Sequence, residues 1–218
     1  MLNFSILTPY VPMLTTAIKL TLQFTFLSTI LGFIWGILLS LIKISRFKPF
    51  VWFGNIYTSF FRGTPLLVQL MIIYYATPQL TGMNITALQA GVFTFGLNSA
   101  AYISESIRGG IMSVDRGQWE AAMALGVPKT KMMFNIIFPQ AVKNIMPSLV
   151  NESIALLKDS SMVSVIGVGD TMRWASLIQA KTFRAFEAFI VAALVYYALV
   201  MVLTALGSYF ERRARVSD

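Results

Sequence analysis

Long apolar stretches alternate with short polar ones along almost the whole chain. Five of them are long enough to cross a membrane as helices, at approximately 15–42, 54–80, 86–110, 138–160 and 187–210. A bilayer core of about 30 Å is crossed by roughly 20 helical residues. The pattern predicts an all-α, polytopic membrane protein with five transmembrane helices, folded as a single transmembrane domain over residues 1–218. An odd number of spans places the two termini on opposite sides of the membrane.

The basic residues indicate which connections are cytoplasmic, because Lys and Arg are enriched in short cytoplasmic loops. They follow the first, third and fifth stretches: Lys43, Arg46 and Lys48; Arg108, Arg116, Lys129 and Lys131; Arg212, Arg213 and Arg215. The connection after the second stretch, TPQLTGMN, carries no charge. This distribution predicts an N-terminus outside and a cytoplasmic C-terminus. The basic segment 161–186 departs from the rule, and the sequence leaves its shape open.

Composition agrees with a membrane protein and argues against other classes. Of the 218 residues, 56% are hydrophobic and 12% are charged, whereas soluble domains carry about 25% charged residues. Without Cys or His, the chain has no disulfides, no thiolate or imidazole metal ligands and no histidine base. The basic residues behind the net charge of +8 are spread between apolar runs, which disfavours nucleic-acid binding. The start, MLNFSILTPYVPML, lacks the basic region of a signal peptide, so we expect the first span to be retained.

One polar stretch differs from the other connections. Residues 119–141, WEAAMALGVPKTKMMFNIIFPQA, stand between the third and fourth spans, and a short cytoplasmic helix is predicted in the region of about 116–131. The helix is expected to end at Gly126, because glycine is common just after helix ends. From the residues alone, an amphipathic connector at the membrane surface is as good an interpretation as a docking site for another protein.

This stretch resembles a known family. Glu120-Ala121-Ala122, Gly126, Ile136 and Pro139 resemble the EAA motif of bacterial ABC importer permeases, with Phe138 where the family pattern has Leu. The resemblance covers essentially the whole chain and is specific for the polar amino-acid (histidine/glutamine/arginine) uptake branch. It is carried by FRGTPLLVQL (61–70), LNSAAYISESIRGGIMSVDRGQWEAA (97–122), FPQAVKNIMPSLVNESIALLKDSSMVSVIGVGD (138–170) and FERR (210–213).

The resemblance implies the transmembrane subunit of an ATP-driven importer in the bacterial cytoplasmic membrane. The implied partners are two ATP-binding cassette subunits, a second permease copy or a related permease, an external solute-binding protein and the amino-acid substrate. ATP and Mg would bind to the partner ATPase. This chain contains no G-x-x-x-x-G-K-[ST] sequence to hold nucleotide phosphates, so we expect it to be non-enzymatic and to hold no cofactor.

The short cytoplasmic helix would then be a coupling helix that docks the ATPase. Glu120 near its start complements the helix dipole. Ala121 and Ala122 allow another protein to approach closely, Gly126 ends the helix, and Pro139 completes the motif. Bulky side chains at these small residues should therefore uncouple ATP hydrolysis from transport.

Polar groups within the spans are candidates for binding the substrate, because such groups are costly in lipid. Glu152 and Asp159 lie two turns apart on one face of the fourth span, and we expect them to hold the cationic side chain of arginine, lysine or histidine. The alternative is that Lys158 neutralises Asp159 in a structural ion pair. In the third span, Asn98 and Tyr102 are candidates to bind a zwitterion, or to form interhelical hydrogen bonds.

The second span contains a predicted break at Gly63-Thr64-Pro65. Proline donates no N–H and clashes with the preceding turn, and broken membrane helices commonly mark transport sites; a simple kink is the alternative. Arg62, just before the break, is expected to form a structural ion pair with Glu105, since charges at membrane depth are usually paired. The pocket or gate candidates after the break are Thr64, Leu67, Val68 and Gln69.

Together these residues favour the import of basic amino acids. A glutamine or cystine importer of the same family, in which the two acids are structural, stays open. An ATP-independent secondary transporter or channel is a different class of function, but such proteins usually contain internal repeats. The sequence leaves open whether two identical chains pair and whether the membrane subunit itself selects its substrate.

Overall fold

Helices make up nearly all of the part that the computed structural model describes, residues 2–215, with side chains to residue 213. This confirms the all-α class. The elements are a 3₁₀ helix Phe4–Tyr10, α1 (Val11–Ile44), α2 (Lys48–Gly63), α3 (Leu66–Met71), a π-helical turn Ile72–Ala76, α4 (Thr77–Thr81), α5 (Ala87–Met112), α6 (Arg116–Ala124), α7 (Lys129–Met132), a π-helical turn Met133–Ile137, α8 (Phe138–Asp159), a 3₁₀ helix Ser160–Ile166, α9 (Thr171–Thr182) and α10 (Ala185–Arg215).

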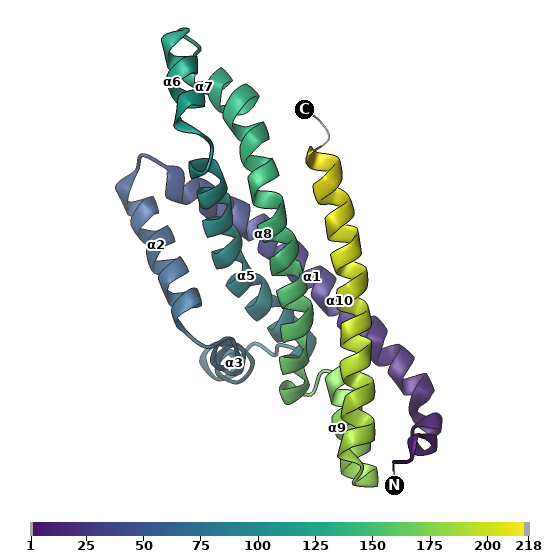
Figure 1. Cartoon of the computed structure of the whole chain (residues 1–218). Helices are drawn as coiled ribbons and strands as arrows, with labels where there is room; N and C mark the ends of the chain where they lie inside the picture. Colours follow the sequence, from purple (N-terminus) through teal and green to yellow (C-terminus); the bar gives the residue numbers. More distant parts are fainter. Residues whose placement is uncertain (1, 216–218) are drawn as a thin grey trace.

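Four long helices, α1, α5, α8 and α10, form an elongated bundle (Figure 1). α5 packs against α1 on one side and α8 on the other, and α8 packs in turn against α10. The connection between α1 and α2, the α6–α7 unit and the end of α10 lie toward one end of the bundle. The N-terminus and α9 lie toward the opposite end. The connections predicted to be cytoplasmic therefore share one end of the molecule.

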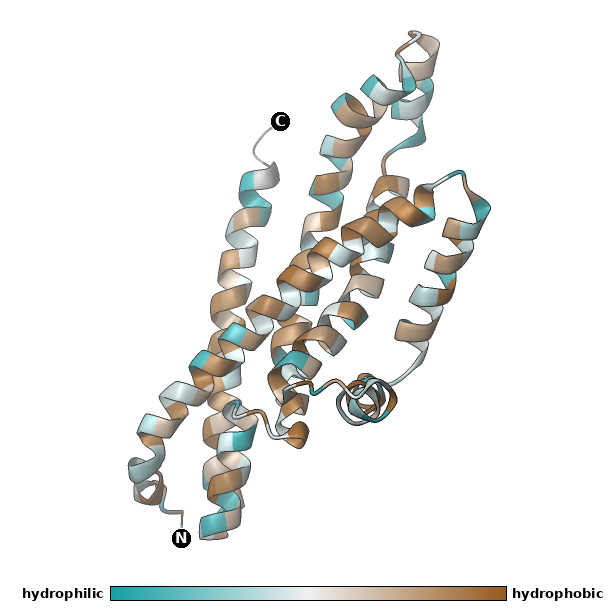
Figure 2. Ribbon diagram, turned by 180° about the vertical axis from the view of Figure 1, so that it is seen from behind, coloured by the Kyte–Doolittle hydropathy of each residue, from teal (hydrophilic) through white to brown (hydrophobic). Residues whose placement is uncertain are grey.

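Two helical stretches, Phe4–Ile44 and Ala185–Arg213, are long and apolar enough to cross a membrane by themselves. Figure 2 shows apolar residues along the lengths of α1 and α10. A third span results if α2 and the helical segment Leu66–Thr81 are counted together. α5 and α8 are 26 and 22 residues long, but polar residues lower their hydropathy. The five-span count therefore stays a prediction.

Segment 161–186, whose shape the sequence left open, folds back against the bundle as the end of a 3₁₀ helix followed by α9. Asp170 caps α9 by accepting hydrogen bonds from two backbone N–H groups of its first turn. The Tyr196 hydroxyl of α10 donates to the same carboxylate over 2.9 Å. The hydroxyl oxygens of Thr171 and Thr21 lie 3.0 Å apart. These contacts fasten α9 to both α10 and α1.

Candidate functional site

The predicted second span is not one continuous helix. α2 ends at Gly63, Thr64 and Pro65 take extended backbone conformations, and α3 starts at Leu66. The two helical parts meet at an angle of 104°. The break falls at the proline, as the sequence predicts, because Pro65 restricts the preceding residue to extended conformations.

A buried amide fixes the geometry of this break. Gln69, 4% exposed, donates from Nε2 to the Phe61 carbonyl, the Thr64 carbonyl and the Thr64 hydroxyl over 2.9, 3.1 and 2.8 Å. Asn98 of α5 donates from Nδ2 to the Phe61 carbonyl and to Gln69 Oε1, each over 3.0 Å. The carbonyls released by the break are thus hydrogen-bonded, as buried backbone groups must be. Gln69 supports the site and does not line it.

A pocket of about 220 Å³ opens between the break, α5 and α8. It unites five of the residues proposed from sequence as substrate-binding or pocket residues, and three apolar residues that were not proposed. Its lining consists of Thr64 and Leu66 from the break, Asn98 and Tyr102 from α5, and Glu152, Ala155, Leu156 and Asp159 from α8. The α8 residues follow the spacing of one helical face. Ala155 and Leu156, which the sequence analysis did not propose, could therefore have been predicted from their position between Glu152 and Asp159 on that face.

The other two candidates, together with Val68, are placed differently. Leu67 is 39% exposed and Val68 49% exposed on α3, and neither lines the pocket. Only the side of α3 that carries Leu66 faces it. The residues after the break therefore divide between pocket wall, surface and hydrogen-bonded support.

The pocket is acidic. Glu152 and Asp159 both line it, and none of its lining residues is basic. No salt bridge joins Lys158 to Asp159 among the described residues, and Lys158 acts on this carboxylate only through its charge from a greater distance. Two carboxylates facing one small cavity favour a cationic group between them.

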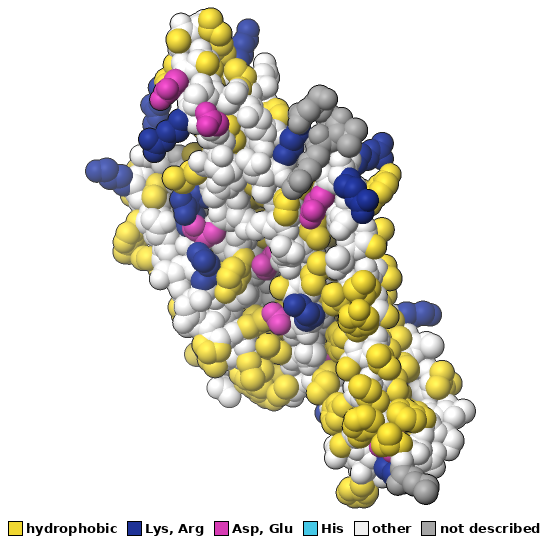
Figure 3. Space-filling model, viewed as in Figure 1, with side chains coloured by type: hydrophobic (Ala, Val, Ile, Leu, Met, Phe, Trp, Pro, Cys, Tyr) yellow, Lys and Arg dark blue, Asp and Glu magenta, His cyan; other side chains and the backbone are white. Residues whose placement is uncertain are grey.

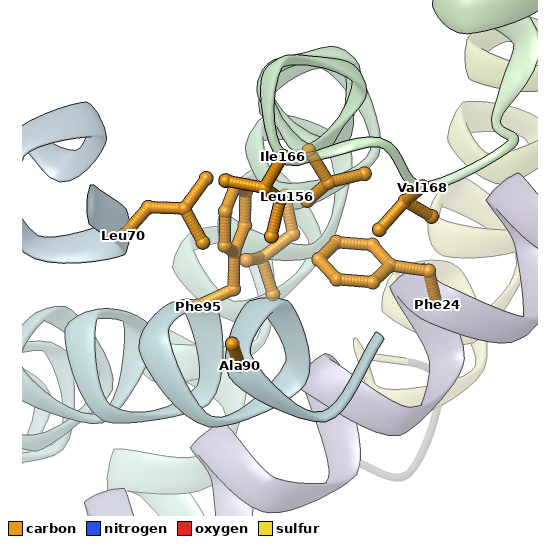
Figure 4. Close-up of a cluster of buried hydrophobic side chains, with 8 residues drawn as sticks. Phe24, Leu70, Ala90, Phe95, Leu156, Ile166 and Val168 are labelled. Carbon is orange, nitrogen blue, oxygen red and sulfur yellow. The ribbon is translucent and has the colours of Figure 1, made fainter. Parts of the chain in front are cut away.

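Apolar packing closes the pocket on one side. Leu156 belongs both to the lining and to a buried cluster that contains Phe24, Phe95 and Leu70 (Figure 4). The rings of Phe24 and Phe95 meet edge to face, with centroids 5.0 Å apart. This cluster holds α1, α3, α5 and α8 in position behind the pocket and excludes water from that side.

The predicted ion pair between Arg62 and Glu105 is wrong. Glu105 is bound by Lys43 from the end of α1 and by Arg108 one turn away on α5. The Lys43 ammonium, 5% exposed, also donates to the Thr58 hydroxyl over 3.0 Å. Both oxygens of Glu105 are therefore occupied. The Arg62 guanidinium instead lies over the ring of Tyr102, 5.3 Å from its centroid.

The EAA segment forms α6, which starts at the expected Arg116 and is capped by Asp115. Gly126 follows with φ of +69°, the left-handed conformation that terminates many helices.

The docking candidates of the EAA segment differ in exposure. Ala122, 3% exposed, packs in a cluster with Val114, Met132 and Ile137. Glu120 and Ala121 are exposed. Pro139 is exposed in the first turn of α8. The docking candidates thus divide into an outward surface and an inward anchor, Ala122.

Comparison with known proteins identifies this arrangement. Residues 28–216 match the family described as binding-protein-dependent transport system inner membrane component. The chain belongs to this family. It is 50% identical over 217 residues to the arginine transport system permease protein ArtQ of Bacillus subtilis, covering 100% of this chain and 99% of the relative. It is 46% identical over 198 residues to the putative glutamine transport system permease protein GlnP of Rickettsia bellii, covering 91% of each.

A solved structure gives the same fold. The crystal structure of an amino acid ABC transporter with histidines contains a chain that is 44% identical, with a TM-score of 0.93, over 98% of this chain and 99% of that chain. The family resemblance found in the sequence is therefore confirmed. The protein is an amino-acid ABC transporter permease, and ATP hydrolysis belongs to a separate ATPase.

In this permease, polar contacts occupy the α5–α8 seam between the pocket and the EAA helix. The hydroxyl oxygens of Ser106 on α5 and Ser148 on α8 lie 2.7 Å apart. Asn144 of α8 donates to Ser113, at the end of α5, over 2.9 Å. Gln140 of α8 reaches Gln118 of α6 over 3.5 Å. A row of contacts therefore runs along the α5–α8 seam from the level below Glu152 to α6.

Proposed function

We propose that this permease is the transmembrane subunit of an ATP-driven importer of polar amino acids, and that it binds basic ones, arginine, lysine or histidine, in the pocket between the α2–α3 break, α5 and α8. The observation that carries this proposal is the pair of carboxylates, Glu152 and Asp159, in a pocket without a basic lining residue. An arginine transport permease at 50% identity supports the same substrate class.

Each polar lining residue has a role in this proposal. Glu152 and Asp159 bind the cationic side chain, because charge-assisted hydrogen bonds to carboxylates are the strongest that a protein offers. Asn98 uses both amide hydrogens within the protein, which leaves its Oδ1 to accept from the α-ammonium group. The Tyr102 and Thr64 hydroxyls border the same space. Leu156 and Ala155 provide apolar contact with the methylene groups.

The same proposal includes the arrangement in the membrane. The permease crosses the bacterial cytoplasmic membrane five times with its N-terminus outside, and α6 lies on the cytoplasmic side. Support comes from the basic connections, which share one end of the bundle, and from the positive-inside rule. Two ATP-binding cassette subunits dock on the exposed face of α6. A second permease copy or a related permease completes the pathway, and an external solute-binding protein delivers the amino acid.

The test is equilibrium binding of arginine, lysine, histidine and glutamine to the purified permease–ATPase complex without its binding protein. Glu152→Gln should weaken binding of the basic amino acids by at least about tenfold, as expected for loss of a charge-assisted hydrogen bond. Glu211→Gln, at the far end of α10, is the matched control and should change nothing.

A different result would favour the second candidate. The glutamine permease relative makes glutamine import the leading alternative, in which the acids are structural. Binding of glutamine alone, with the same affinity in the Glu152→Gln variant, would establish it and remove the role of the carboxylates. Absence of binding by any of the four amino acids would show that the membrane subunit does not select substrate.

A further inference from the structure

Arg62 stands out among the basic residues near the pocket. It lies in the last turn of α2, directly before the break, and its side chain is exposed. Its guanidinium contacts the face of Tyr102, a lining residue of the pocket. Among the described residues, no carboxylate forms an ion pair with it. Arg62 is thus a cation held beside the pocket without an anionic partner.

The neighbouring cations do not share this property. Lys43 and Arg108 both bind Glu105, the acid that the sequence predicted as the partner of Arg62. In the five-span arrangement proposed above, a guanidinium at this position is costly unless it is paired or faces water. An anion that binds in the pocket would supply the missing partner.

The charges around the pocket are complementary to those of a basic amino acid. Carboxylates come from α8, and the guanidinium comes from the end of α2, with α5 between them. Figure 3 shows acidic and basic side chains gathered in the middle of one face, over α2, α5 and α8. A molecule with a cation at one end and a carboxylate at the other would satisfy both sides of the pocket.

We propose that Arg62 binds the α-carboxylate of the transported amino acid; this assignment rests on the proposed function of the pocket. The contact with Tyr102 holds the guanidinium plane over the ring. Its N–H groups at the edge stay free to form the paired, parallel hydrogen bonds that join arginine to carboxylates. Asn98 Oδ1 then receives the α-ammonium group, and Glu152 and Asp159 receive the side chain. Arg62 would recognise the part that every amino acid shares, so it selects for amino acids without choosing among side chains.

The experiment compares substrates with and without the carboxylate. Arginine and agmatine differ only in that group, and so do glutamine and 4-aminobutanamide. Binding of all four is measured on the permease–ATPase complex in lipid nanodiscs, without the binding protein. The variants are Arg62→Gln, Arg62→Lys and, as a control that removes a nearby exposed positive charge from α8, Lys158→Gln. Co-purification of the ATPase and an unchanged Tm verify that each variant is folded.

The wild type should bind arginine at least about tenfold more tightly than agmatine, the size of one charge-assisted interaction. Arg62→Gln should weaken arginine binding by about tenfold or more and agmatine binding by less than about threefold. Arg62→Lys should lie in between, because an ammonium lacks the planar fork of arginine. Lys158→Gln should keep the wild-type preference for the carboxylate.

An equal loss of arginine and agmatine in Arg62→Gln, or an unchanged preference, would overturn the assignment. If the wild type binds glutamine and not arginine, the preference for basic amino acids fails, but the glutamine pair still tests Arg62 by the same ratio. If no amino acid binds to the wild type, the pocket is not a binding site, and both the proposed function and the role of Arg62 are wrong.

Discussion

Two adjacent alanines of the EAA helix differ in their exposure. Ala121 is exposed, whereas Ala122 is 3% exposed and packs against the cluster that joins α6 to α8. Met123 of α6 and Leu125, directly after the helix, are also 56% and 82% exposed. Exposed apolar residues of this kind commonly mark a protein interface. The surface made of Glu120, Ala121, Met123 and Leu125 is therefore the part of the EAA segment to which the proposed function assigns the ATPase contact.

This difference predicts two distinct defects. Ala121→Trp should leave the Tm of the isolated permease unchanged, while co-purification with the ATPase falls by at least about tenfold, the effect of about 1.4 kcal/mol. Ala122→Trp should lower the Tm, because overpacking a filled cluster costs about 1–3 kcal/mol. Equal stability of both variants, or normal ATPase recovery with Ala121→Trp, would contradict the assignment of the two faces.

At the same scale, residue patterns predicted what one helix determines and failed where several helices meet. Glu152 and Asp159 share the pocket because a seven-residue spacing keeps both on one face of α8. The pairing of Arg62 with Glu105 was wrong because depth alone does not reveal that Lys43 reaches the same carboxylate from α1. Gln69 was proposed as a pocket or gate residue, but its amide instead binds carbonyls at the break, and no sequence pattern shows which carbonyls a break releases.

At the scale of elements, close contact between α1 and α5 depends on glycine. A Cβ atom on Gly36 would lie 2.7 Å from Ile103 Cγ2 and 3.2 Å from the Ala100 carbonyl oxygen. A Cβ on Gly109 of α5 would meet nothing within 4 Å. Small residues let membrane helices approach closely, so these two glycines should respond differently to the same substitution.

Gly36→Leu should lower the Tm of the complex by several degrees. Pushing the helices apart costs about 1–3 kcal/mol of stability, and each kcal/mol shifts the Tm by about 2–4 °C. Gly109→Leu should leave the Tm unchanged or raise it slightly, since leucine favours helix by roughly 1 kcal/mol over glycine. Thermal unfolding of both variants makes the comparison. A similar loss in both would mean that helix propensity or lipid contact, and not the α1–α5 seam, determines the effect.

The elements also show the limits of hydropathy. α1 and α10 are apolar over long stretches, so their existence follows from the sequence directly. α5 and α8 carry most of the polar lining of the pocket, and these polar residues lower the mean hydropathy of the two helices. The shape of segment 161–186 could not be predicted because α9 is held by partners remote in the sequence, the hydroxyl groups of Thr21 and Tyr196. A local sequence pattern does not show such contacts.

At the scale of the whole molecule, orientation in the membrane is the property that links the pocket to both partners. The α1–α2 connection and the α6–α7 unit lie toward one end and the N-terminus toward the other (Figure 1). If the basic end is cytoplasmic, α6 meets the ATPase and the N-terminal end meets the solute-binding protein. The opposite orientation would turn the EAA helix away from ATP and make coupling impossible.

The chain contains no cysteine, so single cysteines report orientation without background. Ser5→Cys and Asn84→Cys lie in exposed positions before α1 and between α4 and α5, and Thr130→Cys is exposed in α7. A membrane-impermeant maleimide added to protoplasts or spheroplasts, whose cytoplasmic membrane is intact, should label the first two cysteines and not the third. Permeabilising the membrane should then expose Thr130→Cys. Labelling of Thr130→Cys from outside would mean that the orientation is opposite to the proposed one, and α6 could not be the ATPase site. Labelling of Ser5→Cys but not of Asn84→Cys would show that the broken helix does not cross the membrane.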